Sequence, residues 1–296
     1  MVKQRRRIGI DLGGTKIEGV ALDERMQPLW RERIATESER GYDHILDRLS
    51  LMAAQLRVVV PEAEVLGIGT PGSISARDGT MKNCNTTCLN GRRLHEDIAA
   101  RLHIEVRIEN DANLFSLAEA LAGAGRGASL VFGVIMGTGV GGGIVHNGEL
   151  LTGPQHLAGE WGHHAIDSDG PTCYCGRRGC VESFISGPAL QRQYRELTGH
   201  AADMAEIAAA YRRGESNATA IMKGFIDRFG RALANIVNIL DPDTIVLGGG
   251  LSNIDELYTH GRLAVQRYVF NDELRTPIVR NQLGDSAGVI GAALLA

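Results

Sequence analysis

With 296 residues, the chain is long enough for two domains of ordinary size or for one large domain. Its hydrophobic content of 44% supports a substantial core and excludes wholesale disorder, and its net charge of −4 argues against nucleic acid or an anionic membrane as the main partner. No apolar run approaches the ~20 residues needed to cross a bilayer, and residues 8–14 carry a charge and glycines where the apolar core of a signal peptide would lie.

The chain begins with a short basic run at residues 3–7, which we interpret as a solvated tail. Strands are then predicted over Arg7–Leu12, Lys16–Leu22 and Leu29–Ile34, with a glycine corner between the first two. Adjacent glycines let backbone N–H groups approach a ligand closely, and the side chains at this corner, Asp11, Thr15 and Lys16, suit a phosphate with its magnesium. The alternative is an ordinary hairpin turn.

A helix is predicted over Tyr42–Val58 and a strand over Val65–Ile68. The polar loop at residues 83–90, which includes Asn85, is rich in amides and hydroxyls. It is either a binding surface for a polyhydroxyl compound or a solvated loop.

Asp111 stands where the predicted strand Val106–Glu109 gives way to a helix. Aspartate is favoured as an N-cap residue at such a position. The same position lies at the carboxyl edge of a sheet, where α/β folds bind ligands and where a carboxylate can act as a general base. Both interpretations stay open, and different oxygens of one side chain can serve both roles.

A second glycine corner, Gly137–Gly143, follows the predicted strand Leu130–Met136. It matches the dinucleotide-binding pattern G-x-G-x-x-G, but a strand and an Asn-Gly turn follow it where that fold needs a helix, so we exclude this interpretation. The corner instead repeats the design of residues 8–22 and predicts a second phosphate loop. Further on, the triple glycine Gly248–Gly250 ends a strand and would let a flat purine lie against the backbone.

One histidine and three of the five cysteines gather between Glu160 and Glu182. The odd cysteine total does not suit a disulfide framework, so we expect a reducing, cytoplasmic environment. Three cysteines with a histidine ten positions upstream predict a structural zinc site that fills all four positions of the ion. His164 could replace His163 as the ligand. Because the four ligands already fill the coordination of the ion, we expect Glu160 and Glu182 to have a role other than metal binding. The predicted ligands are His163, Cys173, Cys175 and Cys180.

Each half of the chain opens with a strand, a glycine corner and a strand, which predicts a duplicated α/β architecture with a cleft between the copies. We place a small N-terminal α/β domain at residues 1–122, completed by a C-terminal helix at 285–296. A larger α/β domain at 123–284 carries the zinc loop.

Six motifs occur together along the chain, and these are Asp11–Lys16, Asn110–Asn113, Gly137–Gly143, Glu160–His163, Cys173–Glu182 and Gly248–Gly250. In this order they resemble the ROK family (repressors, open reading frames, kinases), and the resemblance covers nearly the whole chain. Within the family the chain is most similar to bacterial fructokinases of the manno(fructo)kinase type, through residues 72–75, 82–83, 90–91 and 173–176. N-acetylglucosamine kinases are the nearest alternative.

The resemblance implies a two-domain actin-like/hexokinase (ribonuclease H-like) α/β fold with an interdomain cleft. It also implies ATP-dependent phosphorylation of a hexose hydroxyl, with Asp111 as the general base and Mg²⁺ bound with ATP. The ATP-binding residues would be Gly9, Ile10, Asp11, Leu12, Gly13, Gly14, Thr15, Lys16, Gly137, Thr138, Gly139, Val140, Gly141, Gly142, Gly143, Ile144, Gly248, Gly249 and Gly250. The sugar-binding residues would be Asn85, Asn110, Asp111, Glu160, His163 and Glu182.

D-Fructose is the expected acceptor, giving fructose 6-phosphate, with mannose, glucose and N-acetylglucosamine as alternatives. If His163 gives one ring nitrogen to zinc, the other can face the sugar. A repressor of the same family would carry a DNA-binding module ahead of Asp11, where this sequence leaves no room for one. A non-catalytic sugar sensor is the third interpretation. The resemblance further suggests a homodimer.

Overall fold

The computed structural model describes residues 5–296, and their contacts divide the chain into two compact units. The first unit contains the described residues up to Gly123 together with Glu149–Ala158 and Leu283–Ala296. The second contains Ala124–Gly148 and Gly159–Gln282. The segment 149–158, which the sequence-based boundary assigns to the larger domain, groups with the first unit because it packs against the helix that follows Asn110.

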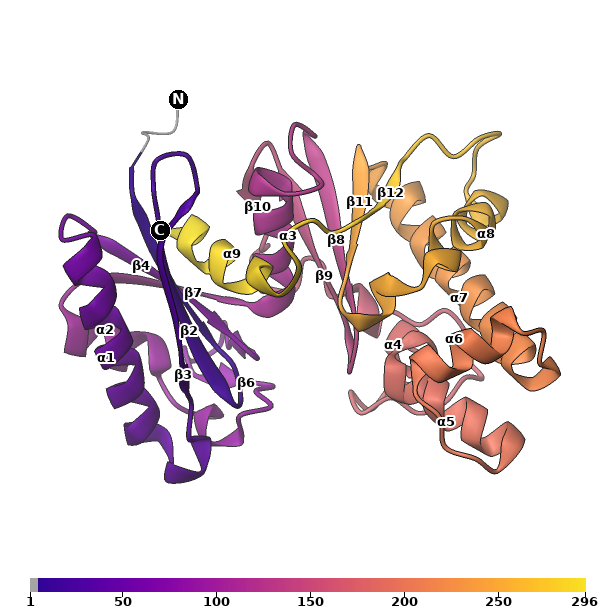
Figure 1. The fold of residues 1–296 in the computed structure, drawn as a ribbon, viewed down its shortest axis with the longest axis horizontal. Coiled ribbons are helices and arrows are strands. Elements are labelled where there is room, and N and C mark those ends of the chain that lie inside the picture. Colours follow the sequence, from indigo (N-terminus) through magenta and orange to yellow (C-terminus); the bar gives the residue numbers. More distant parts are fainter. Residues whose placement is uncertain (1–4) are drawn as a thin grey trace. The chain divides into compact units, whose positions relative to one another are not determined.

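The first unit is built on a five-stranded sheet with the order β3-β2-β1-β4-β7 (Figure 1). The first three strands are antiparallel, whereas β4 and β7 run parallel to β1. The strands are β1 (Arg7–Leu12), β2 (Lys16–Leu22), β3 (Pro28–Ala35), β4 (Val65–Thr70) and β7 (Glu105–Asn110), with the short β5 (Ser73–Ile74), β6 (Met81–Lys82) and β10 (Glu149–Leu150) outside this sheet. The helices are α1 (Tyr42–Val59), α2 (Leu94–Leu102), α3 (Asp111–Ala122) and α9 (Ala287–Leu295).

Helices cover both faces of this sheet. The helices α1 and α2 lie on one face (Figure 1). They bury an apolar stripe, which includes Ile45 and Leu49, against Ile8 and Ile10 of β1. On the other face, α9 lies directly on β1 and β4. The approach is so close that a Cβ atom built on Gly9 would lie 2.1 Å from the backbone nitrogen of Ala293. The C-terminal helix is therefore an integral part of the first unit.

The N-terminal basic run is only partly described, because Lys3 and Gln4 lie outside the described residues. Its last member, Arg7, does not belong to a solvated tail. Its guanidinium donates hydrogen bonds to the backbone oxygens of Leu294 (3.0 Å) and Ala296 (2.7 Å), so it holds the end of the chain against β1.

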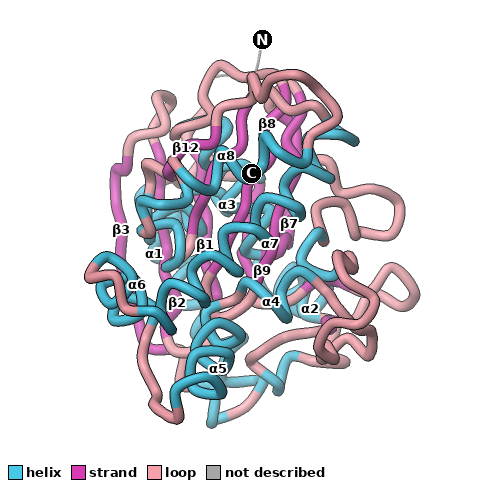
Figure 2. Tube along the Cα trace, turned by 90° about the vertical axis from the view of Figure 1, so that its right-hand side faces the viewer, coloured by secondary structure: helices cyan, strands magenta, loops and turns pink. Residues whose placement is uncertain are grey.

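The second unit contains a sheet in which β9, β8, β11 and β12 are neighbours in this order. A layer of helices accompanies it, with α7 in contact with α4, α5, α6 and α8 (Figures 1 and 2). The strands are β8 (Leu130–Met136), β9 (Val140–His146), β11 (Thr244–Gly248) and β12 (Ile278–Arg280). The helices are α4 (Val181–Ile185), α5 (Gly187–Thr198), α6 (Met204–Arg212), α7 (Ser216–Leu240) and α8 (His260–Tyr268).

Short 3-10 helices occupy several connections, at Ser38–Arg40, Thr87–Leu89, Trp161–His163, Gly250–Asn253, Asp255–Leu257 and Gly284–Ser286. An apolar stripe of α7 forms core, with Phe225 and Phe229 fully buried. Among the described residues, no helix combines the length and the apolar character that a membrane span needs.

Candidate functional site

The first glycine corner is a tight turn between β1 and β2, and it is held from outside by residues that follow β3. Thr36 donates its hydroxyl to the backbone oxygen of Gly13 (2.8 Å), and Ser38 donates to that of Gly14 (3.2 Å). The N–H of Gly13 is used within the turn, because it donates to the backbone oxygen of Lys16 at 2.9 Å. The exposed tip at residues 14–16 is therefore the part of this corner that is available to a ligand.

Three of the predicted ATP-binding residues lie inside the sheet. Ile10 and Leu12 are fully buried in the core, and Gly9 is pressed against α9. Their contribution is to hold the corner in place, and the neighbouring Asp11 supplies the carboxyl of this strand.

Asp11 and Asp111 form an acidic pair within the first unit. Burial raises the pKa of Asp11 to about 6, and the negative charge of Asp111 adds to this effect. Asp111 retains solvent-accessible surface although protein atoms surround its carboxyl densely, and the resulting desolvation raises its pKa. Its Oδ1 accepts the N–H of Ala112 at 2.8 Å. A carboxyl that is accessible and has a raised pKa has the character of a general base.

The N-cap of α3 is Asn110, so the interpretation of Asp111 as the cap is wrong. Oδ1 of Asn110 accepts the N–H of Asn113 at 2.8 Å, whereas Asp111 is the first residue inside the helix. Glu109, which the sequence analysis did not single out, holds this turn together. Its Oε1 accepts the N–H of Asn110 (2.9 Å) and the side-chain amide of Asn113 (3.0 Å). Because the side chain of Asn110 caps the helix, the Asp111 carboxyl is not needed for capping.

The polar loop at residues 83–90 lies beside the first corner. A Cβ atom built on Gly14 would lie 3.5 Å from the hydroxyl oxygen of Thr86, which is buried and has no hydrogen-bond partner among the described residues. Asn90 closes the loop, since its side chain exchanges two hydrogen bonds with the backbone of Cys84 (2.9 and 3.1 Å). Asn85 is exposed on this loop.

The second glycine corner joins β8 to β9, and the N–H of Gly137 donates to the backbone oxygen of Gly139 at 2.9 Å. Because β11 runs parallel to β8, the glycines after β11 lie at the same edge of the sheet as the second glycine corner. Gly249 has a φ of 76°, and a Cβ atom built on it would lie 2.4 Å from the backbone oxygen of Met136. Within the second unit, the predicted phosphate loop and the predicted purine-binding segment are thus neighbours. Gly141, Gly142, Gly143 and Ile144 continue into β9.

Trp161 fastens the segment that carries Glu160 and His163 to β9. Its indole N–H donates to the backbone oxygen of Gly141 at 2.8 Å, and its buried ring meets Phe132 edge to face. Glu160 is exposed. The tryptophan was visible in the motif, but its anchoring role depends on a contact with a strand 20 residues away.

The structure brings the four predicted metal ligands together, with their ligand atoms all within 4.8 Å of one another. Nδ1 of His163 lies 3.6 Å from Sγ of Cys173, and the sulfur atoms of Cys175 and Cys180 are also 3.6 Å apart. Two sulfur ligands at about 2.3 Å from a tetrahedral zinc would lie about 3.8 Å apart. The donor set and its spacing therefore fit a zinc ion.

His164 is turned away from this cluster. Its Nδ1 lies 2.7 Å from the backbone oxygen of Trp161, and its Nε2 lies 3.2 Å from the side chain of Asn235.

The thiols of the metal cluster differ in their pKa values. The backbone N–H of Arg177 lowers the pKa of Cys175 to about 6, whereas burial raises the pKa of Cys180 to about 12.

Glu182, two residues after the last cysteine, contacts the second glycine corner. Its Oε2 accepts the backbone N–H of Val140 at 2.9 Å. Tyr174 lies close enough to Glu182 to be influenced by its charge. Its pKa is raised to about 12, chiefly by burial and further by the negative charges of Glu182, Cys173 and Glu160. Tyr174 was not among the predicted site residues, because its position between two cysteines carries no signal of its own.

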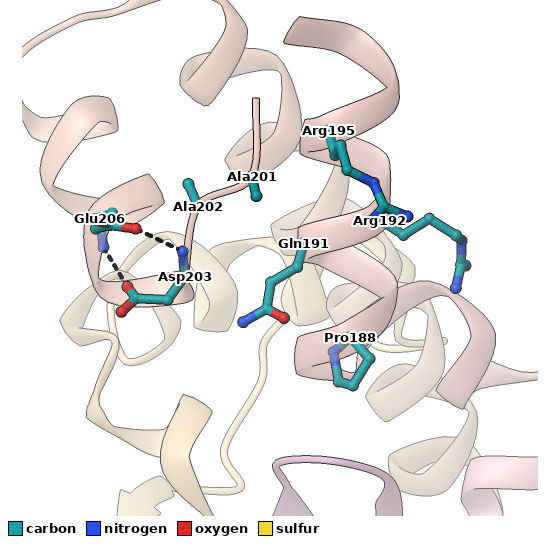
Figure 3. Close-up of a pocket in the computed structure, with 8 residues that line it drawn as sticks. All are labelled: Pro188, Gln191, Arg192, Arg195, Ala201, Ala202, Asp203 and Glu206. Atoms are coloured by element: carbon teal, nitrogen blue, oxygen red, sulfur yellow. Dashed lines mark hydrogen bonds between the residues drawn. The ribbon is translucent and has the colours of Figure 1, made fainter. Parts of the chain in front are cut away.

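A separate depression of about 410 Å³ lies between α5 and α6 (Figure 3). It contains none of the motif residues. Its two acidic lining residues, Asp203 and Glu206, accept hydrogen bonds from each other's backbone N–H groups in a capping box, at 2.8 Å each. We therefore assign the candidate functional groups of the first unit to its glycine corner and the acidic pair, and those of the second unit to its glycine corner and the metal cluster.

Comparison with known proteins gives a consistent result. The sequence model of the ROK family matches residues 7–296. An N-acetyl-D-glucosamine kinase of Yersinia pseudotuberculosis is 36% identical over 297 residues, which cover 97% of each chain.

Two solved structures are similar over nearly the whole chain. The crystal structure of a ROK hexokinase from Thermus thermophilus has a TM-score of 0.90 and 30% identity, covering 98% of this chain and 97% of that one. A ROK family glucokinase from Streptomyces griseus, in complex with glucose and AMPPNP, has a TM-score of 0.78 and 28% identity, covering 98% and 99%. This likeness confirms the predicted α/β fold of the hexokinase type.

Proposed function

The chain belongs to the ROK family, and on that premise we propose that it is a sugar kinase that transfers the γ-phosphoryl group of ATP to a hexose hydroxyl. The observation that carries the proposal is the Asp111 carboxyl, which is accessible, has a raised pKa and lies near Asp11 of the first glycine corner. A phosphoryl transferase needs such a base beside groups that hold phosphates and a cation.

The two glycine corners are proposed to hold the phosphates of ATP. Phosphoryl transfer depends mainly on positioning and on neutralising charge, and backbone N–H groups at exposed glycine turns provide both. The tip at residues 14–16 and the corner at residues 137–140 would serve the phosphates, and Gly248–Gly250 would lie beside the adenosine. Asp11 would hold Mg²⁺, which would supply positive charge to neutralise the phosphates.

Asp111 is proposed to accept the proton of the attacking sugar hydroxyl. Its pKa, raised by desolvation, makes it a stronger base than an ordinary aspartate. The hydrogen bonds of Glu109 and Asn110 hold the turn on which Asp111 stands, so the base is carried by a rigid element.

The sugar is proposed to contact the amides of Asn85 and Asn110 and the side chains of Glu160 and Glu182. Amide and carboxylate groups at exposed or half-exposed positions match the donors and acceptors of a hexose. His163, Cys173, Cys175 and Cys180 would hold a zinc ion, which supplies a structural cross-link for the segment between Glu160 and Glu182.

N-Acetyl-D-glucosamine is the acceptor that we propose first, because the relative at 36% identity is an N-acetyl-D-glucosamine kinase. D-Fructose is the second candidate, since residues 72–75, 82–83, 90–91 and 173–176 resemble those of fructokinases. A hexose-specific site rejects an analogue chiefly by leaving its own polar groups unpaired, so the ratio of kcat/KM values between sugars is the decisive quantity.

The test is a coupled assay of ADP release with ATP, Mg²⁺ and a panel of N-acetylglucosamine, fructose, mannose and glucose. We expect turnover with at least one hexose and the highest kcat/KM with N-acetylglucosamine. A higher value for fructose would reverse the order of the two candidates. Sugar binding without ADP release from any member of the panel would contradict the kinase and favour a sugar sensor. The homodimer and the cytoplasmic location stay predictions, which light scattering and cell fractionation would test.

A further inference from the structure

The metal cluster leads directly into a short helix that reaches the second glycine corner. Cys180 is both a member of the cluster and the N-cap residue of α4. The helix is tied back to the cluster segment, since the N–H of Val181 donates to the backbone oxygen of His164 at 3.1 Å. The same loop that carries the metal ligands therefore determines where α4 lies.

Two hydrogen bonds connect this region to the two ends of the corner. Glu182 of α4 accepts the N–H of Val140 at 2.9 Å. Gly187, at the start of α5, donates its N–H to the backbone oxygen of Gly137 at 2.8 Å. Because Gly137 and Val140 bracket the turn, these bonds fix its width and its orientation.

The carboxylate of Glu182 also fills the space beside the turn. A Cβ atom built on Gly139 would lie 2.7 Å from Oε2 of Glu182, so the carboxylate packs against the backbone of the corner. A hydrogen bond from a backbone N–H to an ionised carboxylate is stronger than one between neutral groups. This single side chain thus holds a loop that would otherwise have to be ordered when a ligand binds.

We propose that Glu182 is a positioning residue for the nucleotide, acting through the second glycine corner, in addition to its proposed contact with the sugar. The inference rests on the proposed function, because it takes residues 137–140 to bind the phosphates of ATP. The carboxylate of Glu182 keeps the corner in the shape that receives them. Its contribution appears in the affinity for the nucleotide, before any sugar is present.

The experiment measures the Kd of Mg·ADP by calorimetry, without sugar, on the full-length protein with its bound metal quantified. We expect Glu182→Ala to raise the Kd about tenfold. Glu182→Gln keeps an oxygen that can accept the N–H of Val140, so it should stay within about threefold of the unaltered protein. Gly139→Ala, which pushes the carboxylate away, should resemble Glu182→Ala.

Glu196→Ala is the matched control. It removes the same side chain from α5, where Glu196 is exposed and pairs with Arg192 at 3.9 Å, and it should leave the Kd unchanged. Equal metal content and equal Tm across the variants separate positioning from a loss of folding. In steady-state kinetics, Glu182→Ala should raise the KM for ATP, whereas Glu182→Gln should have a KM close to that of the unaltered protein.

The outcomes distinguish the inference from the function on which it rests. If the unaltered protein binds no Mg·ADP, the proposed function and the role of Glu182 are both overturned. If it binds Mg·ADP and Glu182→Ala binds equally well or more tightly, only the role of Glu182 is overturned. Tighter binding by both Glu182 variants would mean that the carboxylate repels the phosphates instead of shaping the corner.

Discussion

The hydroxyl of Tyr174 lies 2.9 Å from Nε2 of His163, and the two rings meet edge to face with centroids 5.1 Å apart. Since Nδ1 of His163 faces the thiol of Cys173, the tyrosine is the partner of the second nitrogen of the ring. A metal-binding histidine usually donates its other N–H to an oxygen that fixes the orientation of the ring. The sequence predicts that this nitrogen can face a sugar, and in the structure Tyr174 is its partner.

We predict that Tyr174→Phe weakens zinc binding by about tenfold, because the ring contact stays but the oxygen that holds His163 is lost. Competition with a chelator of known affinity measures the effect. Tyr258→Phe is the control, since its hydroxyl donates to Ser252 in the same unit and should not influence the cluster. Equal zinc affinity in the Tyr174→Phe variant and the unaltered protein would show that the tyrosine does not hold the ligand.

Asp111→Asn is predicted to lower kcat by at least about 100-fold, since an amide cannot accept the proton of the sugar hydroxyl. The Kd of the sugar should change by less than about threefold, because the amide has nearly the shape of the carboxyl. Single-turnover kinetics and sugar calorimetry on one preparation measure both quantities. A variant that retains the original kcat would remove Asp111 from the role of base.

Turnover should also depend on pH through Asp111. Desolvation raises its pKa above the ordinary value of 3.8, so the ionised base is lost at a higher pH than for an exposed aspartate. We predict an acidic limb in the profile of kcat against pH whose midpoint lies well above 3.8. A kcat that stays constant down to pH 4 in folded protein would disagree with a desolvated carboxyl as base.

The parts of the site that could be predicted from the sequence are those whose signal is local. Glycines after apolar runs locate both corners, and the spacing of Cys173, Cys175 and Cys180 indicates a shared ligand site because the residues lie close along the chain. The error over the helix cap is also local. Asn110 and Asp111 are equally good N-cap residues, and only the backbone decides which one precedes the first turn.

The remaining contacts depend on tertiary packing that has no period or motif. Glu182 and Val140 are 42 residues apart, and their hydrogen bond exists because α4 begins at the metal cluster and points toward β9. In the same way, Gly9 reads as part of a phosphate motif, whereas the structure shows that α9 from the other end of the chain leaves no room for a side chain there. Such pairings follow from the fold and become visible only with it.

Asp11 provides a prediction about stability. Its folded-state pKa of about 6 exceeds the ordinary 3.8, so the folded protein binds this proton more tightly than the unfolded chain does. The resulting stabilisation is fully present below pH 3.8 and is lost as the pH rises through 6. At pH 8 the ionised carboxylate therefore opposes folding. We predict that Asp11→Asn raises the free energy of unfolding at pH 8 by up to roughly 3 kcal/mol.

Urea unfolding at a series of pH values measures this effect, and the advantage of Asp11→Asn should shrink as the pH falls from 6 toward 4. The control is Asp272→Asn on an exposed turn, which should change stability by less than about 0.5 kcal/mol at every pH. The Asp11 variant should nevertheless lose most of its turnover, because this carboxyl is proposed to hold Mg²⁺. A variant that is destabilised at pH 8 would show that the Asp11 carboxylate is stabilised by its surroundings.

Removal of the metal should lower stability and sugar affinity together. A ligand at about 100 times its Kd stabilises the folded state by about 2.7 kcal/mol, which corresponds to a Tm shift of roughly 5–10 °C. We therefore predict that a chelator lowers Tm by this amount. Well below that Tm it should also weaken sugar binding, because Glu160 and Glu182 flank the segment that the metal cross-links. Added Zn²⁺ should restore both.

Cys175→Ser should reproduce the effect of the chelator, because it removes one of the four ligands, whereas Cys88→Ser removes a thiol outside the cluster and should retain the metal. Differential scanning calorimetry and sugar calorimetry on both variants, with zinc content measured by atomic absorption, separate the two consequences. A metal-free Cys175→Ser protein with a lowered Tm but unchanged sugar affinity would limit the metal to a role in folding. It would also remove the proposed link between the cluster and the sugar-binding carboxylates.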